Sequence, residues 1–183
     1  IAPIQTNSND GFKLPSYEEI EKTINLKTKA FLITNPNNPT GAVFTRDELV
    51  PICEYLTKKS IIIMSDEIYE SISFDFDFVS VASLSKEIYD NTIIINGFSK
   101  SSSMTGWRLG WIAAPEWIAK GINKLQGQYT SGTCSVSQMA AVAAYEADQA
   151  CVAEYREAFR RRRDLIVRLA KEIPGLEVNV PQG

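Results

Sequence analysis

An unbroken apolar segment lies near the middle of the chain, Ser60-Ile61-Ile62-Ile63-Met64-Ser65. Apolar side chains at consecutive positions, rather than at alternate ones, indicate a strand covered on both faces, as in a parallel sheet. Similar short apolar runs occupy residues 30–34, 92–95 and 109–114. Helical patterns flank these strands, over residues 15–24, 45–58, 115–128, 136–147 and 151–173. The order of elements therefore predicts an α/β fold with a mostly parallel sheet.

Two of the predicted helices begin with a capping box. Ser16 is followed three positions later by Glu19, and Thr45 by Glu48. The longest helix is predicted to end at Pro174-Gly175, and residues 176–180 read as the start of another strand. That strand is followed only by Pro181-Gln182-Gly183, so we expect the domain to be truncated there.

Composition excludes several classes of partner. The chain has 183 residues, 44% of them hydrophobic and 22% charged, as in ordinary globular proteins. A net charge of −3 gives no reason to expect nucleic acid or an anionic membrane surface. Arginines fill positions 160–163, but consecutive helical residues point in different directions, so we interpret this run as a solvated or ion-paired helix face. No apolar run approaches the roughly 20 residues that span a bilayer.

Cysteine spacing and the lack of histidine narrow the chemistry further. Cys53, Cys134 and Cys151 are far apart, which predicts reduced, buried thiols in a cytoplasmic protein. With 0 histidines, a Ser-His-Asp triad, a Cys-His pair and a histidine metal site are excluded within the chain, and we expect no metal. Proton transfer must use Lys, Asp, Glu, Tyr, Cys or a cofactor.

Three polar motifs follow three of the predicted strands. They are Asn-Pro-Asn-Asn-Pro-Thr-Gly at 35–41, Ser-Asp-Glu-Ile-Tyr-Glu at 65–70, and Gly-Phe-Ser-Lys with Thr-Gly-Trp-Arg at 97–108. Each alone is also typical of a turn, a helix cap or an exposed loop. Ligands of open parallel sheets bind outside the carboxyl ends of the strands, so we expect Asn38, Asp66 and Lys100 to form one site. A desolvated lysine with Arg108 close behind it can lose its proton and attack carbonyls.

Together these motifs resemble the class I/II aminotransferases, which are fold-type I enzymes that use pyridoxal 5′-phosphate. Residues 7–14, 124–128 and 159–164 resemble the bacterial aspartate aminotransferase branch in particular, and the resemblance covers essentially the whole chain. It implies a three-layer large domain, truncated at both ends. Residues 1–150 would be the central and late part of this cofactor-binding domain. Residues 151–183 would be the interdomain helix and the first strand of the small domain.

The resemblance also implies a role for each site residue. Lys100 would hold the cofactor as a Schiff base and then act as the general base. Asp66 would keep the pyridine nitrogen protonated, and Asn38 and Tyr69 would donate to the phenolic oxygen. Arg108 would bind the phosphate through two oxygens at once. The peptide bond after Asn38 would be cis.

One position departs from the family pattern. Gly97 stands where many relatives carry a serine that contacts the phosphate, and Ser99 offers a hydroxyl nearby. The family's ring-stacking aromatic residue, its partner-subunit tyrosine and its substrate-binding arginine have no counterpart in this chain. We therefore expect the intact protein to be a homodimer, with little transamination by these residues alone.

The implied reaction is transamination between aspartate and 2-oxoglutarate. Cofactor chemistry is shared across the fold, whereas substrate groups decide the reaction. Alternatives on the same fold are an alanine or aromatic aminotransferase, a carbon–sulfur lyase or an aminocyclopropane carboxylate synthase. A third possibility is an aminotransferase-like sensor domain of a bacterial transcription regulator.

Overall fold

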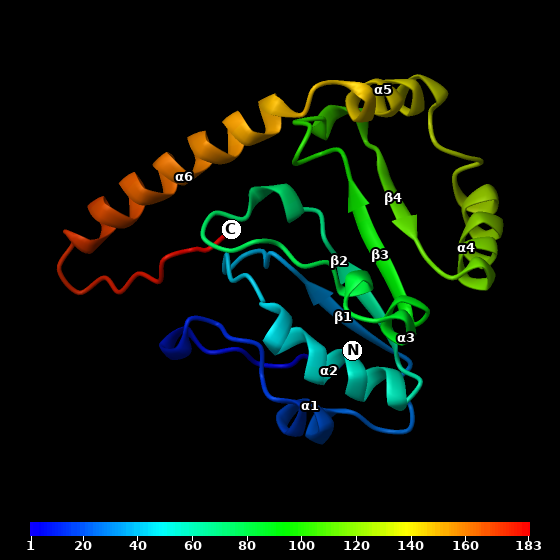
Figure 1. The fold of residues 1–183 in the computed structure, drawn as a ribbon, viewed down its shortest axis with the longest axis horizontal. Coiled ribbons are helices and arrows are strands. Elements are labelled where there is room, and N and C mark those ends of the chain that lie inside the picture. The colour runs from blue at the N-terminus through cyan, green and yellow to red at the C-terminus, as the bar shows by residue number, and fades with distance from the viewer.

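A four-stranded sheet forms the centre of the molecule in the computed structural model, which describes residues 1–183 (Figure 1). The strands lie side by side in the order β1 (Ala30–Thr34), β2 (Ile62–Asp66), β3 (Thr92–Gly97) and β4 (Gly110–Ala113). The first three are parallel, and β4 runs antiparallel to β3. The predicted α/β fold with a mostly parallel sheet is confirmed.

Six α-helices and four short 3-10 helices connect and follow the strands. The α-helices are α1 (Tyr17–Thr23), α2 (Arg46–Lys58), α3 (Lys86–Tyr89), α4 (Glu116–Tyr129), α5 (Ser135–Glu146) and α6 (Ala150–Lys171). The 3-10 helices are η1 (Ser8–Asp10), η2 (Glu70–Ile72), η3 (Val81–Ser83) and η4 (Thr105–Trp107). None of the helices combines the length and the apolar character needed to cross a membrane.

The predicted capping boxes fix the starts of α1 and α2. The Ser16 hydroxyl accepts from the Glu19 backbone N–H at 3.4 Å, and the Glu19 carboxylate accepts from the Ser16 N–H at 3.0 Å. In α2 the Glu48 carboxylate accepts from both the backbone N–H and the hydroxyl of Thr45, each at 2.8 Å. These contacts satisfy donors that a helix start leaves free.

The main hydrophobic core lies between α2 and one face of the sheet. Leu49, Ile52 and Leu56 of α2 are buried in one cluster with Ile33 of β1 and Ile63 of β2. On the opposite face of β1, the Leu32 side chain is 63% exposed. Successive strand residues point to opposite faces of the sheet, so Ile33 is buried against α2 while the adjacent Leu32 is exposed on the other face.

The strand predicted from residue 176 to residue 180 is not formed. A strand is stable only when its backbone pairs with a neighbour, and no strand of this chain lies beside it. Instead the segment after α6 runs back toward the sheet (Figure 1), where the Gln182 backbone N–H donates to the Gly41 carbonyl at 2.7 Å. The division into a large domain up to residue 150 and a small domain beyond it stays a prediction.

The prediction of three buried thiols is correct only for Cys53. Cys53, on the buried face of α2, is 1% exposed, whereas Cys134 and Cys151 are exposed. All three are free. Cys134 precedes α5 and Cys151 lies in the first turn of α6, and both side chains are exposed at these positions. Local sequence patterns did not distinguish those positions from the core.

Thiol alkylation should separate these cysteines. Burial raises the pKa of the Cys53 thiol to about 12, while backbone N–H groups of Val136 and Ser137 lower the pKa of Cys134. The thiolate is the reactive form. At mildly alkaline pH, iodoacetamide should label Cys134 and Cys151 in the native protein and Cys53 only after unfolding, as mass spectrometry of the digest would show. Native-state labelling of Cys53 at the rate of Cys151 would contradict the burial described above.

Candidate active site

The loop after β1 is held in place by its own buried side chains. Asn35, 1% exposed, accepts through its side-chain oxygen from the Phe44 N–H at 2.8 Å and donates to the Phe44 carbonyl at 3.4 Å. The Thr40 hydroxyl donates to the Asn37 side-chain oxygen at 2.8 Å. The peptide bonds before Pro36 and Pro39 are both cis, and the second is the one that the family resemblance implies. Asn38 is exposed within this internally hydrogen-bonded loop.

Two consecutive acids in different environments lie where β2 ends, Asp66 as its last residue and Glu67 as the first residue of the following loop. Glu67 is 2% exposed and accepts from the Ser65 hydroxyl at 2.8 Å, the Ser80 hydroxyl at 3.1 Å and the Val81 N–H at 3.0 Å. Asp66 is half-buried and accepts from the Ile68 N–H at 3.2 Å. Alternation along the strand end directs the two side chains to opposite faces. Glu67 therefore anchors the loop in the core and leaves Asp66 at its edge.

Glu67 should make stability fall as pH rises. Burial raises the pKa of Glu67, against the smaller effect of its three donors, so the native state keeps this proton at a pH where the unfolded chain has lost it. Stability then falls with pH between the ordinary and the raised pKa. Glu67→Gln should flatten the profile of unfolding free energy over this window, measured with urea between mildly acidic and neutral pH.

The exposed Glu54 provides the matched control for this test. It forms a surface ion pair with Lys58 at 3.8 Å on α2. Glu54→Gln should leave the pH profile as in the unsubstituted protein, because exposed pairs contribute little. An unchanged slope in Glu67→Gln would show that the buried carboxyl does not titrate as described.

The loop after β3 is anchored on both sides of Lys100. Phe98 and Met104 are buried in a second cluster with Ala141 of α5. The Phe98 ring meets the Tyr145 ring edge-on at a centroid distance of 4.7 Å, a favourable aromatic geometry. The Met104 N–H donates to the Phe98 carbonyl at 3.1 Å, which closes the loop into a compact turn. Lys100 is half-buried within it.

The three loops meet through direct side-chain contacts. The Asn38 amide donates to the Tyr69 hydroxyl oxygen at 3.2 Å. The Lys100 amine lies 5.3 Å from the centroid of the Tyr69 ring, within the range of a cation–π interaction. One residue from each loop therefore takes part, as the shared edge of the parallel strands predicts.

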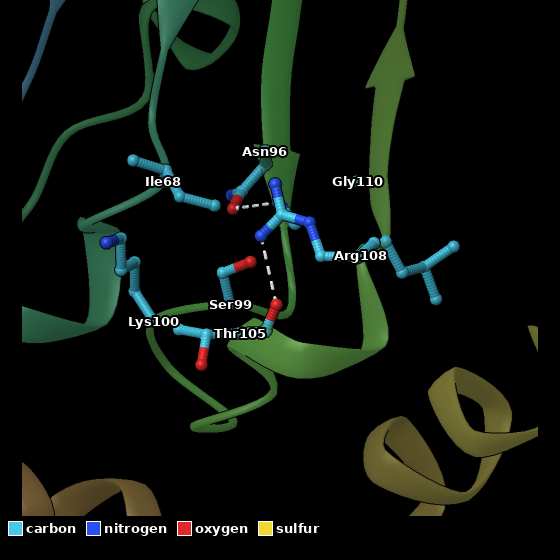
Figure 2. Close-up of a pocket in the computed structure, with 9 residues that line it drawn as sticks. Ile68, Asn96, Ser99, Lys100, Thr105, Arg108 and Gly110 are labelled. Atoms are coloured by element: carbon cyan, nitrogen blue, oxygen red, sulfur yellow. Dashed lines mark hydrogen bonds between the residues drawn. The ribbon is translucent and has the colours of Figure 1, made fainter. Parts of the chain in front are cut away.

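Lys100 and Arg108 line one cavity of about 420 Å³ (Figure 2). The Arg108 guanidinium donates to the Thr105 carbonyl at 3.0 Å, and in this view the two cationic side chains lie on either side of Ser99. The remaining lining residues are Ile68, Asn96, Gly97, Leu109 and Gly110. Two cations and two hydroxyl side chains around one cavity favour an anionic ligand with a carbonyl group.

These residues fit pyridoxal phosphate. Arg108 with the hydroxyls of Ser99 and Thr105 can hold a phosphate, and Lys100 can reach an aldehyde. Asn96 lines the same cavity, and its buried side-chain nitrogen makes no hydrogen bond of good geometry within the chain. Burial raises the pKa of Glu70, and the Asn96 amide lies near enough to that carboxylate to act against the rise, so this polar group belongs to the wall of the cavity.

Only some of the predicted site residues contact one another directly. Contacts link Asn38, Tyr69 and Lys100, and Arg108 shares the cavity with Lys100. Asp66 begins the loop that carries Tyr69, and its hydrogen bond is to that loop. The individual chemical roles stay predictions.

Sequence reasoning missed Asn96 and Thr105 as lining residues. The sequence contains a feature that could have identified each of them. Asn96 is a polar residue at the end of an apolar strand, and Thr105 lies within the Thr-Gly-Trp-Arg motif.

Close packing of β3 on β4 explains Gly97. A Cβ atom added there would lie 2.9 Å from the Leu109 carbonyl oxygen and 3.0 Å from the Gly110 Cα. Both obstacles are backbone atoms, so no side chain fits without moving a strand. Ser99 lines the cavity instead.

Gly97→Ser should therefore destabilise the protein. Overpacking against backbone costs about 1–3 kcal/mol, and chemical denaturation measures this directly. The matched control is Gly121→Ser in α4, where an added Cβ meets no atom within 4 Å. That change should alter stability by no more than about 0.5 kcal/mol. Equal stability of the two variants would contradict the close approach of the strands.

Comparison with known proteins establishes the family. The family described as "Aminotransferase class I and II" matches residues 1–183. The chain belongs to this family, and its α/β architecture is that of the fold-type I aminotransferases.

Named relatives and solved structures agree with this assignment. The aspartate/prephenate aminotransferase of Cereibacter sphaeroides is 43% identical over 175 residues, covering 94% of this chain and 44% of the relative. The aspartate aminotransferase of Bacillus subtilis is 42% identical over 173 residues, covering 94% and 44%. The crystal structure of the Rhizobium meliloti aspartate aminotransferase superposes with a TM-score of 0.94 at 36% identity, covering 98% of this chain and 45% of that one. The aromatic aminotransferase of Pyrococcus horikoshii gives 0.91 at 36% identity, covering 97% and 48%.

The chain spans less than half the length of the curated relatives that it matches. This part of the relatives' length contains all three polar motifs described above.

Proposed function

We propose that this chain is part of a pyridoxal-phosphate-dependent aminotransferase that transfers the amino group of aspartate to 2-oxoglutarate. The observation that carries the proposal is the meeting of Asn38, Tyr69 and Lys100 beside a cavity that Arg108 lines. The names of the relatives support aspartate as the amino donor.

Lys100 and Asp66 carry the proton chemistry in this proposal. When bound, pyridoxal phosphate supplies an electron-accepting ring that stabilises negative charge at the α-carbon of the substrate. The Lys100 amine takes the proton from that carbon, which requires a neutral amine held within reach. The Asp66 carboxylate would accept a hydrogen bond from the protonated ring nitrogen, and a charge-assisted bond of this kind contributes about 1.5–3 kcal/mol.

Asn38, Tyr69 and Arg108 orient the ring. The Tyr69 hydroxyl oxygen accepts from the Asn38 amide, so its own proton is free to be donated to the phenolic oxygen. The second amide hydrogen of Asn38 is available to the same acceptor. The Arg108 guanidinium can hold two phosphate oxygens in a fixed geometry. Together these three residues would hold the cofactor at its phenolic oxygen and at its phosphate.

An aromatic amino donor is the second candidate. It is favoured by the structural match to the aromatic aminotransferase of Pyrococcus horikoshii, at 36% identity. The residues proposed to hold the ring are the same for both donors, because the cofactor chemistry is common to them. Incubating the full-length protein with 2-oxoglutarate and either aspartate or phenylalanine, and measuring glutamate, decides between them. Formation of pyruvate and ammonia would instead indicate a carbon–sulfur lyase, and formation of aminocyclopropane carboxylate would indicate the synthase.

We also propose a cytoplasmic homodimer. The three free cysteines suit a reducing compartment. Exposed large apolar side chains on α4 and α5, among them Trp117, Tyr129 and Met139, suit a surface that is covered in an assembly.

Substitution of Lys100 tests the proposed function. Lys100→Ala in the full-length protein should reduce glutamate formation from aspartate and 2-oxoglutarate by at least about a thousandfold, because the general base is removed. Asp66→Ala should slow the reaction by several orders of magnitude and weaken cofactor binding. Lys120→Ala is the matched control, since Lys120 is exposed and pairs only with Glu116 on its own helix. Normal turnover by Lys100→Ala would remove the assignment.

A further inference from the structure

Arg163 differs from the other arginines of α6 in what it contacts. Its side chain is only 11% exposed and forms a two-point ion pair with Asp75, whose second contact is 3.3 Å. Its guanidinium lies 5.0 Å from the centroid of the Phe74 ring and donates to the Pro181 carbonyl at 2.9 Å. Arg160, 46% exposed, pairs with Glu157 of the same helix. Both arginines are ion-paired, as predicted, and Arg163 also pairs with its neighbour Asp164 at 2.9 Å. Arg163 differs because its own side chain is largely buried, although Asp75 is 39% exposed, and because its contacts reach residues outside α6.

Residues 181–183 lie between the segment that contains Phe74 and Asp75 and the loop that carries Asn38. We call these three residues the strap. The Gln182 carbonyl accepts from the Phe74 N–H at 2.7 Å. On the other side, the N–H groups of Gln182 and Gly183 both donate to the Gly41 carbonyl, at 2.7 and 3.0 Å. The Gln182 side-chain oxygen accepts from the Val43 N–H at 3.0 Å.

The strap fits the loop without spare room. A Cβ atom on Gly41 would lie 2.4 Å from the Pro181 Cβ, and Gly41 has φ of +69°, which favours glycine. The Gly41 N–H donates to the Asn37 carbonyl at 2.8 Å, and the Asn37 N–H donates to the Ala42 carbonyl at the same distance. The strap is thus bonded to the residues that enclose Asn38 in its loop.

A continuous series of contacts therefore runs from α6 to the candidate active site. It passes from Arg163 to the strap, from the strap to Gly41, and from the loop of Gly41 through Asn38 to Tyr69. We infer that Arg163 is a positioning residue that holds the Asn38 loop against Tyr69 and so couples the placement of α6 to the geometry of the site. The part concerning the cofactor rests on the proposed function, and the part concerning the strap does not.

Arginine suits this position for a physical reason. Its planar fork can meet a carboxylate at two points while another face lies over an aromatic ring, which an ammonium group cannot reproduce. Removing it leaves the Asp75 carboxylate and the Pro181 carbonyl without their donor. Because the Arg163 side chain is only 11% exposed, this loss costs more than the loss of a pair such as Arg160–Glu157, in which the side chains are 46% and 44% exposed.

Hydrogen–deuterium exchange of the full-length protein without cofactor tests the strap. In Arg163→Met, the Val43 and Phe74 amides, which donate to Gln182 of the strap, should exchange roughly tenfold faster, as the loss of about one hydrogen bond predicts. Arg160→Met is the matched control and should exchange there as the unsubstituted protein does. Asp75→Asn weakens the same ion pair with little change of shape and serves where Arg163→Met does not fold. Unchanged exchange in both Arg163→Met and Asp75→Asn would overturn the inference, whatever the protein catalyses.

A spectroscopic titration with pyridoxal phosphate tests the coupling to the site. If the strap holds Asn38 at the phenolic oxygen, then Arg163→Met should raise the midpoint pH of the bound cofactor's absorbance change by about half a unit or more, in the same direction as Asn38→Ala. Arg163→Lys should fall between Arg163→Met and the unsubstituted protein, and Arg160→Met should not move the midpoint. A merely structural role would lower the melting temperature and leave this midpoint in place.

The two measurements keep the inference and the proposed function apart. Faster exchange with an unmoved midpoint in Arg163→Met, while Asn38→Ala shifts it, would overturn the coupling. If Asn38→Ala itself leaves the midpoint unchanged, the role proposed for Asn38 fails, and the exchange result alone decides whether Arg163 positions the loop.

Discussion

The site depends on one constraint, which is that three parallel strands end next to one another at the same edge of the sheet. Thr34 lies opposite Asp66, and Asp66 lies opposite Ile95, so β1 and β2 end side by side next to the end of β3. Parallel strands point their carboxyl ends to the same edge, and each then releases a loop there. A shift of one residue in this register would turn every side chain of a strand to the other face and separate the loops.

Each functional residue stands close in sequence to a residue that is buried in the core. Asn35 bonds the start of the loop that carries Asn38, Glu67 follows Asp66, and Phe98 precedes Lys100 by two positions. Side chains in loops keep a defined position only where neighbouring residues are fixed by packing and hydrogen bonds. This pairing of a buried anchor with an exposed functional group explains how three flexible-looking motifs can form one geometry.

Local sequence patterns were sufficient to predict elements whose signals lie within a few residues of the element itself. The apolar run at 30–34 and the two capping boxes predicted β1, α1 and α2 with small errors at their ends. Failures came where distant residues decide the outcome. Residues 176–180 have the composition of a strand but no partner strand. The ion-paired helix face is confirmed for Arg163, but the sequence did not identify its partner, an aspartate 88 positions away. Neither a missing neighbour nor a long-range ion pair leaves a trace in local periodicity.

Chemical trapping of the cofactor tests the central claim most directly. The full-length protein is loaded with pyridoxal phosphate, reduced with sodium borohydride, digested and analysed by mass spectrometry. Our account predicts one modified peptide, with the phosphopyridoxyl group on Lys100. Modification of a different lysine, or a spread over several exposed lysines, would contradict the site described here.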